Sequence, residues 1–246
     1  MSEQTAYLLV FHGSRSRHYP EKMSQLGTLL RYELASLVEV AVLELAQTPL
    51  ADRIVQFCHE AIAVGYQQVK VVPAFLSEGV HVSEDIPQEI ARAKTRLDLS
   101  CDVRVDVELL EHLGSSLDLV ELVQQRFSSS KSDAKILIAH GSRFEAGNVQ
   151  TKVIADNLGA AISYWKAAPD LDSVVESLVM QNKESITIVP YFLFLGRITD
   201  AIASRVTQLQ LRYPQTSISL TQPLGATPEL ARVIARIALK KTVALS

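Results

Sequence analysis

The chain has 246 residues and a mass of 27.1 kDa, a length that fits one large domain or two domains of about 120 residues each. Hydrophobic residues make up 48% and charged residues 21%, which excludes an intrinsically disordered chain because enough apolar surface is present to offset the entropy lost on folding. The net charge of −3 and the pI near 6.1 give no global basic footprint, so these values disfavour nucleic acid as a partner.

No apolar run approaches the roughly 18–20 residues that a membrane-spanning helix requires. The first residues lack the basic region of a secretory signal, and their apolar run ends at His12. The two cysteines, Cys58 and Cys101, are too few for a disulfide framework or for the thiolate ligands of a typical iron–sulfur cluster. We therefore expect a cytoplasmic protein without a membrane partner.

Two pairs of similar segments divide the chain into halves. Residues 7–15 (YLLVFHGSR) resemble residues 135–143 (KILIAHGSR), and residues 71–79 (VVPAFLSEG) resemble residues 188–196 (IVPYFLFLG). The matches occur in the same order, which indicates an internal duplication.

A polar, Ser-rich linker is expected between the copies, over residues 127–134. We predict an N-terminal domain over residues 1–128 and a C-terminal repeat domain over residues 133–246.

Within each half, short apolar runs alternate with segments of helical periodicity. In chain order, the first half predicts strands over residues 7–11, 38–45, 69–72 and 103–109, with helices over residues 23–37, 50–64, 85–97 and 117–127. The second half predicts strands over residues 136–139, 161–165, 186–189 and 218–220, and a last helix with apolar residues at positions 230, 233, 234 and 237. This alternation predicts an α/β fold with two doubly wound parallel sheets.

Polar residues follow the first three strands of the first half. His12 follows the first strand, Glu44 the second, and His81 lies in the loop after the third. In the doubly wound order 2-1-3-4 these strands are neighbours about 4.8 Å apart, and ligands bind at their carboxyl ends. Two imidazoles and a carboxylate suit a divalent first-row metal, and imidazoles also move protons near neutral pH. On position alone, a histidine after a strand is more often a hydrogen-bonding residue than a metal ligand. Asp85 is expected to cap the next helix.

The second half keeps only part of this set. It retains His140, but it has Ile198 at the position of His81, and Trp165 and Lys166 in the stretch that matches Glu44. The full constellation therefore occurs once. His140 is either a remnant of the duplication or a contributor to the opposite wall of a cleft.

Three segments of the first half, LLVFHGSR, LELAQTPL and VVPAFLSEGVHVSEDIP, together resemble the sirohydrochlorin chelatases of the CbiX/SirB type in their two-domain form. The stretch from Phe75 to Pro87 is the most specific of them. The resemblance implies two tandem flavodoxin-like domains of the class II chelatase fold, with the active site in the cleft between them. It also implies that His12 and His81 bind metal and act in catalysis, with assistance from Glu44.

The resemblance further implies a lyase that inserts Fe²⁺, Co²⁺ or Ni²⁺ into sirohydrochlorin, in siroheme or cobalamin synthesis. The metal is a substrate, and we expect no permanently bound cofactor and no iron–sulfur cluster. No segment resembles a P-loop, so ATP is not expected. Sirohydrochlorin carries many carboxylates, which need polar or basic partners on the protein. The substrate-binding candidates in the two HGSR motifs are Ser14, Arg15 and Arg143, and Arg197, which follows Gly196, is the fourth.

The internal duplication would make a monomer sufficient to form the site. A non-catalytic cytosolic carrier of metal or tetrapyrrole would use the same ligands and is the main alternative. A further alternative is a phosphoryl-transfer enzyme or phosphatase in which the HGSR loops bind phosphate. The sequence does not distinguish iron from cobalt or nickel, because availability and geometry govern the choice among such ligands.

Overall fold

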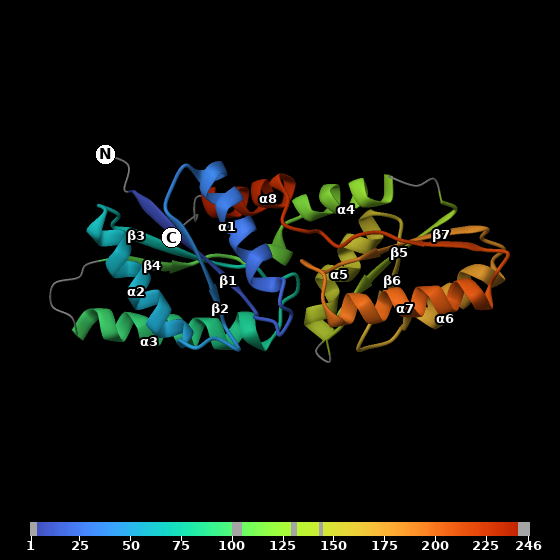
Figure 1. The fold of residues 1–246 in the computed structure, drawn as a ribbon, viewed down its shortest axis with the longest axis horizontal. Coiled ribbons are helices and arrows are strands. Elements are labelled where there is room, and N and C mark those ends of the chain that lie inside the picture. The colour runs from blue at the N-terminus through green and yellow to red at the C-terminus, as the bar shows by residue number, and fades with distance from the viewer. Residues whose placement is uncertain (1–3, 100–104, 129–131, 143–144, 241–246) are drawn as a thin grey trace. The chain divides into compact units, whose positions relative to one another are not determined.

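A computed structural model describes residues 4–99, 105–128, 132–142 and 145–240. It confirms the predicted α/β class, with two four-stranded parallel sheets and helices on both faces of each (Figure 1). No helix in these ranges has the length and apolar character needed to cross a membrane. Arg143 and Cys101 lie outside the described residues.

The first sheet has the strand order β2-β1-β3-β4, which is the predicted doubly wound order. Its strands are β1 (Thr5–Phe11), β2 (Val38–Val42), β3 (Gln68–Pro73) and β4 (Asp106–Leu109). The helices of the first half are α1 (Tyr19–Leu34), α2 (Leu50–Ala63), α3 (Ile86–Leu99) and α4 (Asp118–Ser128), with a π-helical turn η1 (His81–Asp85) and a 3₁₀ turn η2 (Leu113–Ser115). Val10 pairs with Ala41 and with Pro73, so the neighbouring strands β2, β1 and β3 end together at one edge of the sheet.

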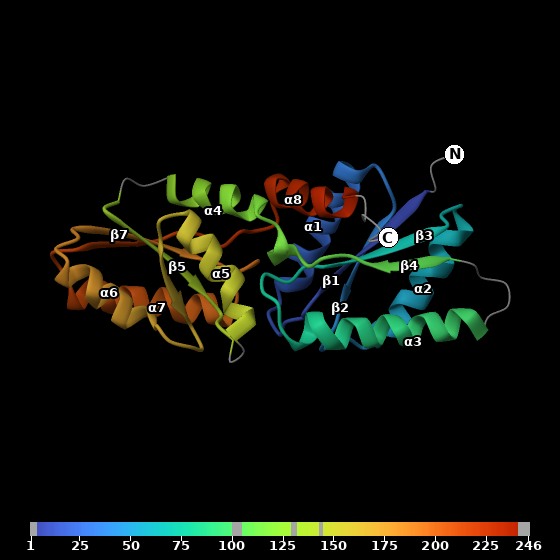
Figure 2. The same ribbon diagram turned by 180° about the vertical axis from the view of Figure 1, so that it is seen from behind.

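The core of this sheet follows from its apolar strands. Residues Leu8, Leu9 and Val10 of β1 are completely buried, as a central strand covered on both faces requires. Helices α2 and α3 cover one face, and α1 covers the other together with α8 (Pro228–Leu239) from the end of the chain (Figures 1 and 2).

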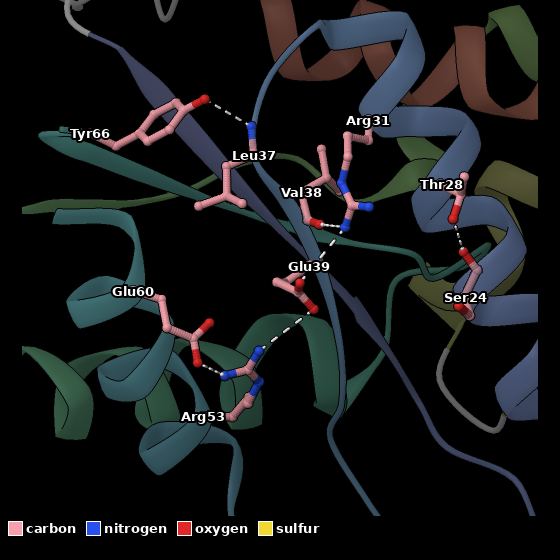
Figure 3. Close-up of polar contacts among 9 residues, drawn as sticks. All are labelled: Ser24, Thr28, Arg31, Leu37, Val38, Glu39, Arg53, Glu60 and Tyr66. Carbon is pink, nitrogen blue, oxygen red and sulfur yellow. Dashed lines mark hydrogen bonds and ion pairs between the residues drawn. The ribbon is translucent and has the colours of Figure 1, made fainter. Parts of the chain in front are cut away.

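Side chains hold the start of the edge strand β2 in place (Figure 3). The Arg31 guanidinium donates to the Val38 carbonyl at 2.7 Å, and the Leu37 amide donates to the Tyr66 hydroxyl at 3.1 Å. Ion pairs nearby join Arg31 to Glu39, Arg53 to Glu39 and Arg53 to Glu60. Half-exposed ion pairs contribute little, so the bonds to the backbone provide most of this anchoring. They orient the strand that leads to Glu44.

The second sheet repeats this topology, with order β6-β5-β7-β8. Its strands are β5 (Ala134–Ala139), β6 (Ala161–Tyr164), β7 (Ser185–Pro190) and β8 (Ser217–Leu220). The remaining helices are α5 (Glu145–Asn157), α6 (Leu171–Met180) and α7 (Arg197–Arg212). Ile138 pairs with Ser163 and with Pro190, so these strands also end together at one edge.

The last helix of each half packs with the other half. Unit 1 consists of Met1–Phe75, Val80–Ser116 and Thr227–Ser246, and unit 2 consists of Leu76–Gly79 and Leu117–Ala226. Helix α8 therefore packs beside α1 in unit 1, and α4 packs beside α5 in unit 2. These units differ from the predicted ranges 1–128 and 133–246 because the apolar stripe of a helix shows that it is buried, but not against which sheet.

Candidate functional site

The three residues predicted after the strands of the first half come together in unit 1. His12 directly follows β1, Glu44 lies two residues beyond β2, and His81 begins η1. One ligand atom from each lies within 4.8 Å of the others, and within the described ranges this is the one His, Cys, Asp and Glu group that meets this geometry. All three side chains are exposed or half-buried, so a metal ion can reach them.

The spacing of these atoms approaches that of metal ligands. The rings of His12 and His81 are 4.7 Å apart and nearly perpendicular, and His81 Nε2 lies 3.8 Å from Glu44 Oε1. Two ligands at about 2.1 Å from a tetrahedral metal are about 3.4 Å apart, so small side-chain movements suffice for coordination. Three protein ligands leave further positions of the metal open to a substrate.

Both rings use Nδ1 in a hydrogen bond, and the Nε2 of His81 faces Glu44. The Nδ1 of His81 is 2.7 Å from Asp85 Oδ2, and the Nδ1 of His12 is 3.3 Å from the Gly13 carbonyl. A carboxylate and a carbonyl only accept, so the proton in these bonds is on Nδ1 and the Nε2 lone pair is left for a metal. A carboxylate behind a ligating histidine is a common support of metal sites because it orients the ring.

Asp85 is not the helix cap that the sequence predicted. It lies inside a continuous helical segment, because η1 leads directly into α3, and its carboxylate accepts from His81 four residues earlier. The Ile86 amide donates to the His81 carbonyl, which is the i to i+5 bond of a π turn. Such turns are rare and occur often at functional sites.

Gly13 allows the His12 loop to approach the end of β2. Its φ is +104°, and an added Cβ would lie 2.2 Å from the Glu44 carbonyl oxygen. The Glu44 amide donates to the His12 carbonyl at 2.9 Å, which joins the two residues through the backbone. A glycine is therefore required here by both conformation and space.

Phe75 lies near both histidine rings, and His112 holds the backbone of Phe75 in place. The Phe75 ring lies 6.1 Å from the ring of His12 and 6.3 Å from that of His81. The buried His112 donates from Nδ1 to the Phe75 carbonyl at 3.1 Å, and the Gly114 amide donates to the same oxygen at 2.8 Å. The sequence offered no sign of this role, since His112 belongs to neither repeat motif.

The predicted substrate-binding residues have different surroundings. Ser14 is exposed, and its Oγ accepts from the Ser16 amide at 3.1 Å. Arg15 and Arg197 are exposed, and neither has an ion pair with any residue that the structure describes. Contact of these residues with a tetrapyrrole stays a prediction, and Arg143 lies outside the described residues.

Cys58 takes no part in this group. It is fully buried in the core between α2 and the sheet. Burial raises the pKa of the Cys58 thiol to about 12, so it does not supply a thiolate ligand at neutral pH.

Unit 2 presents a different group at the same strand ends. His140 follows β5, and its Nδ1 lies 2.9 Å from the Gly141 carbonyl. The Lys166 amide donates to the His140 carbonyl at 2.9 Å, so Lys166, rather than Trp165, occupies the position of Glu44. Ile198 lies at the position of His81. The three matched residues of unit 2 are therefore His140, Lys166 and Ile198, and only the first could bind a metal.

Comparisons with known proteins point to one family. The family model for CbiX matches residues 6–130 and 134–240. A sirohydrochlorin ferrochelatase of Priestia megaterium is 24% identical over 93% of this chain and 87% of its own length, and a sirohydrochlorin cobaltochelatase of the same organism is 24% identical over 92% and 76%. The structure of SirB from Bacillus subtilis with Fe³⁺ matches with a TM-score of 0.80 at 22% identity, over 96% of this chain and 94% of that one.

Proposed function

The chain belongs to the CbiX family, and from this membership we propose that it is a sirohydrochlorin chelatase, a lyase that inserts Fe²⁺ or Co²⁺ into sirohydrochlorin. The observation that carries the proposal is the convergence of His12, Glu44 and His81 at one sheet edge, with ligand atoms within 4.8 Å. This set consists of the donors that such metals accept, and it is accessible from solvent.

The reaction exchanges protons for a metal ion. The macrocycle loses two pyrrole N–H protons, the metal forms bonds to the freed nitrogens, and the ligands of the protein release the metal. His12 and His81 are suited to both tasks, because each Nε2 lone pair binds the metal first and accepts a proton once the metal has left. The two histidines thus give up a doubly charged metal ion and take up two protons, so the net charge of the site does not change.

Glu44 adds one negative charge to the two neutral imidazoles. That charge attracts a divalent cation. Because the Glu44 side chain is half-exposed, water screens the charge and the attraction is moderate. A site for a metal that must leave benefits from moderate affinity. Open coordination positions allow the macrocycle nitrogens to bind before the protein ligands dissociate.

The proposed partners are sirohydrochlorin and the metal, and the proposed reaction takes place in the cytoplasm without ATP, without an iron–sulfur cluster and without a permanently bound cofactor. One copy of the chain is proposed to suffice, without a membrane or nucleic acid partner. Ser14, Arg15, Arg143 and Arg197 are proposed to bind the carboxylates of the tetrapyrrole, because a guanidinium pairs with a carboxylate through two hydrogen bonds.

Replacing Asp85 by Asn is expected to weaken Co²⁺ binding about 10- to 100-fold, because the His81 ring loses the charged acceptor that orients it and raises its basicity. Titration of the protein with Co²⁺, followed by absorbance, measures this effect. Asp98→Asn, an exposed position near the end of α3, is the matched control and should bind as the wild type does. Equal affinity in the two variants would show that Asp85 does not support the metal site.

An anaerobic absorbance time course with sirohydrochlorin and Fe²⁺ or Co²⁺, at substoichiometric protein, tests the proposed function. Conversion faster than the spontaneous reaction, with many turnovers per chain, is the expected result. Tight binding of metal or tetrapyrrole without acceleration would favour the carrier that uses the same ligands. Absence of both binding and acceleration would reject both functions.

A further inference from the structure

The two units present the same backbone arrangement at the ends of their strands. The Glu44 amide donates to the His12 carbonyl, and the Lys166 amide donates to the His140 carbonyl, both at 2.9 Å. The same holds beside the third strand, where the matched bonds run from Ala74 N to Val10 O and from Tyr191 N to Ile138 O. Residues at these ends can therefore be compared position by position.

The charges at several matched positions differ between the two units, and at one position they are opposite. Lys166 stands in the place of Glu44, so an anionic position has become cationic. After the third strand the shared glycines give an offset of 196 − 79 = 117, which places Arg197 at Val80. The other matched pairs in this loop are His81 and Ile198, Ser83 and Asp200, Glu84 and Ala201, and Asp85 and Ile202. Three carboxylates of unit 1 thus correspond to one lysine and two apolar residues, while unit 2 gains one arginine and one aspartate.

This substitution pattern is unsuited to a metal ion. The ammonium of Lys166 has no lone pair to give to a metal, and it repels a cation. His140 and Asp200 are then the only groups of the matched set that could act as ligands, and within the described ranges neither belongs to a group of three such residues. The lysine at the position of Glu44, and the arginine in the loop after the third strand, instead favour an anion.

The two cations are available to a ligand. Lys166 and Arg197 are exposed, and among the described residues neither forms an ion pair. The loop after His140 is held by Asn148, whose amide accepts from the Ser142 amide and donates to the Ser142 carbonyl, both at 2.8 Å. The loop after His140 is therefore fixed by side-chain bonds to its backbone.

We propose that the strand ends of unit 2 form a carboxylate-binding site, with Lys166 as its central cation and Arg197 as a second cation from the loop after the third strand. The ligand is a side-chain carboxylate of the polycarboxylate tetrapyrrole, so this inference rests on the proposed function. After duplication, one copy of the arrangement holds the metal and the other copy holds the organic substrate.

Equilibrium binding of sirohydrochlorin, measured by fluorescence in the absence of metal, tests the site. Lys166→Met should weaken binding about 10-fold, and Lys166→Glu should weaken it further because a carboxylate repels the ligand. The affinity of both variants should also depend less on salt than that of the wild type, since one screened attraction is lost. A merely structural role of Lys166 would not change the salt dependence.

Lys183→Met and Lys183→Glu are the matched controls, because Lys183 lies just before β7, at the opposite edge of the same sheet. The inference is overturned if Lys166→Glu binds sirohydrochlorin as the wild type does, if the Lys183 variants lose as much affinity, or if the wild type does not bind it. Co²⁺ binding should be unchanged in Lys166→Met, which adds no carboxylate ligand for a metal. Wild-type protein that binds the tetrapyrrole at Lys166 but inserts no metal would reject the proposed function and leave this site standing.

Discussion

Replacing His81 by Ala should reduce metal insertion to the spontaneous rate, a loss of more than about 100-fold. The substitution removes one of three ligands and one of two proton acceptors, so both steps of the proposed reaction fail together. His12→Ala should have the same effect, because its ring lies 4.7 Å from that of His81 and completes the same set. The anaerobic absorbance time course with Co²⁺ measures the loss.

The fold should survive both substitutions. The side chain of His81 is 34% exposed and that of His12 is exposed, so neither fills the core. His59→Ala provides the control, since His59 is an exposed histidine on α2 away from the strand ends. Unchanged circular dichroism and thermal midpoint in all three variants are expected. Near wild-type turnover without His81 would show that the site lies elsewhere.

A chain that ends at Ala226 should lose the fold of unit 1, although unit 1 would keep its entire sheet. Helix α8 contributes four large apolar side chains that are at most 5% exposed: Leu230, Val233, Ile234 and Ile237. Burial of four such side chains is worth about 6–12 kcal/mol. This is comparable to the total stability of a domain, about 5–15 kcal/mol. Without α8, the matching face of α1 would also be exposed to water.

Amide hydrogen exchange measures this prediction residue by residue. In the shortened chain the amides of β1 and β3 should exchange rapidly, and Co²⁺ binding should disappear with them. A chain that ends at Lys240 keeps α8 and is the control. Protected β1 amides after removal of α8 would show that unit 1 is stable without it.

The exchange of helices also affects the choice of fragments. A fragment of residues 133–246 would carry α8 without α1, and it would lack α4, which packs beside α5. Its failure to insert metal would therefore reflect incomplete folding as well as missing ligands. Substitutions in the full chain, such as His81→Ala and Lys166→Glu, test the two units without this complication.

The central residues of the candidate site could be predicted from the sequence because parallel strands bring their carboxyl ends to one edge. His12, Glu44 and His81 each follow a strand, and the strand order places those strands side by side. The support by Asp85 could not be predicted in this way. Its position before α3 equally fits a helix cap, and only the π turn brings its carboxylate to His81.

By itself, the sequence determined the class of the fold, the duplication, the order of strands and helices, and the three candidate ligands that lie together, because each depends on local periodicity and on the edge where strands end. Only the tertiary structure decided which unit buries α4 and α8, that Lys166 replaces Glu44, and that His112 holds Phe75. Those features depend on contacts between residues far apart in the chain, and an apolar stripe or a lone polar residue does not specify its partner.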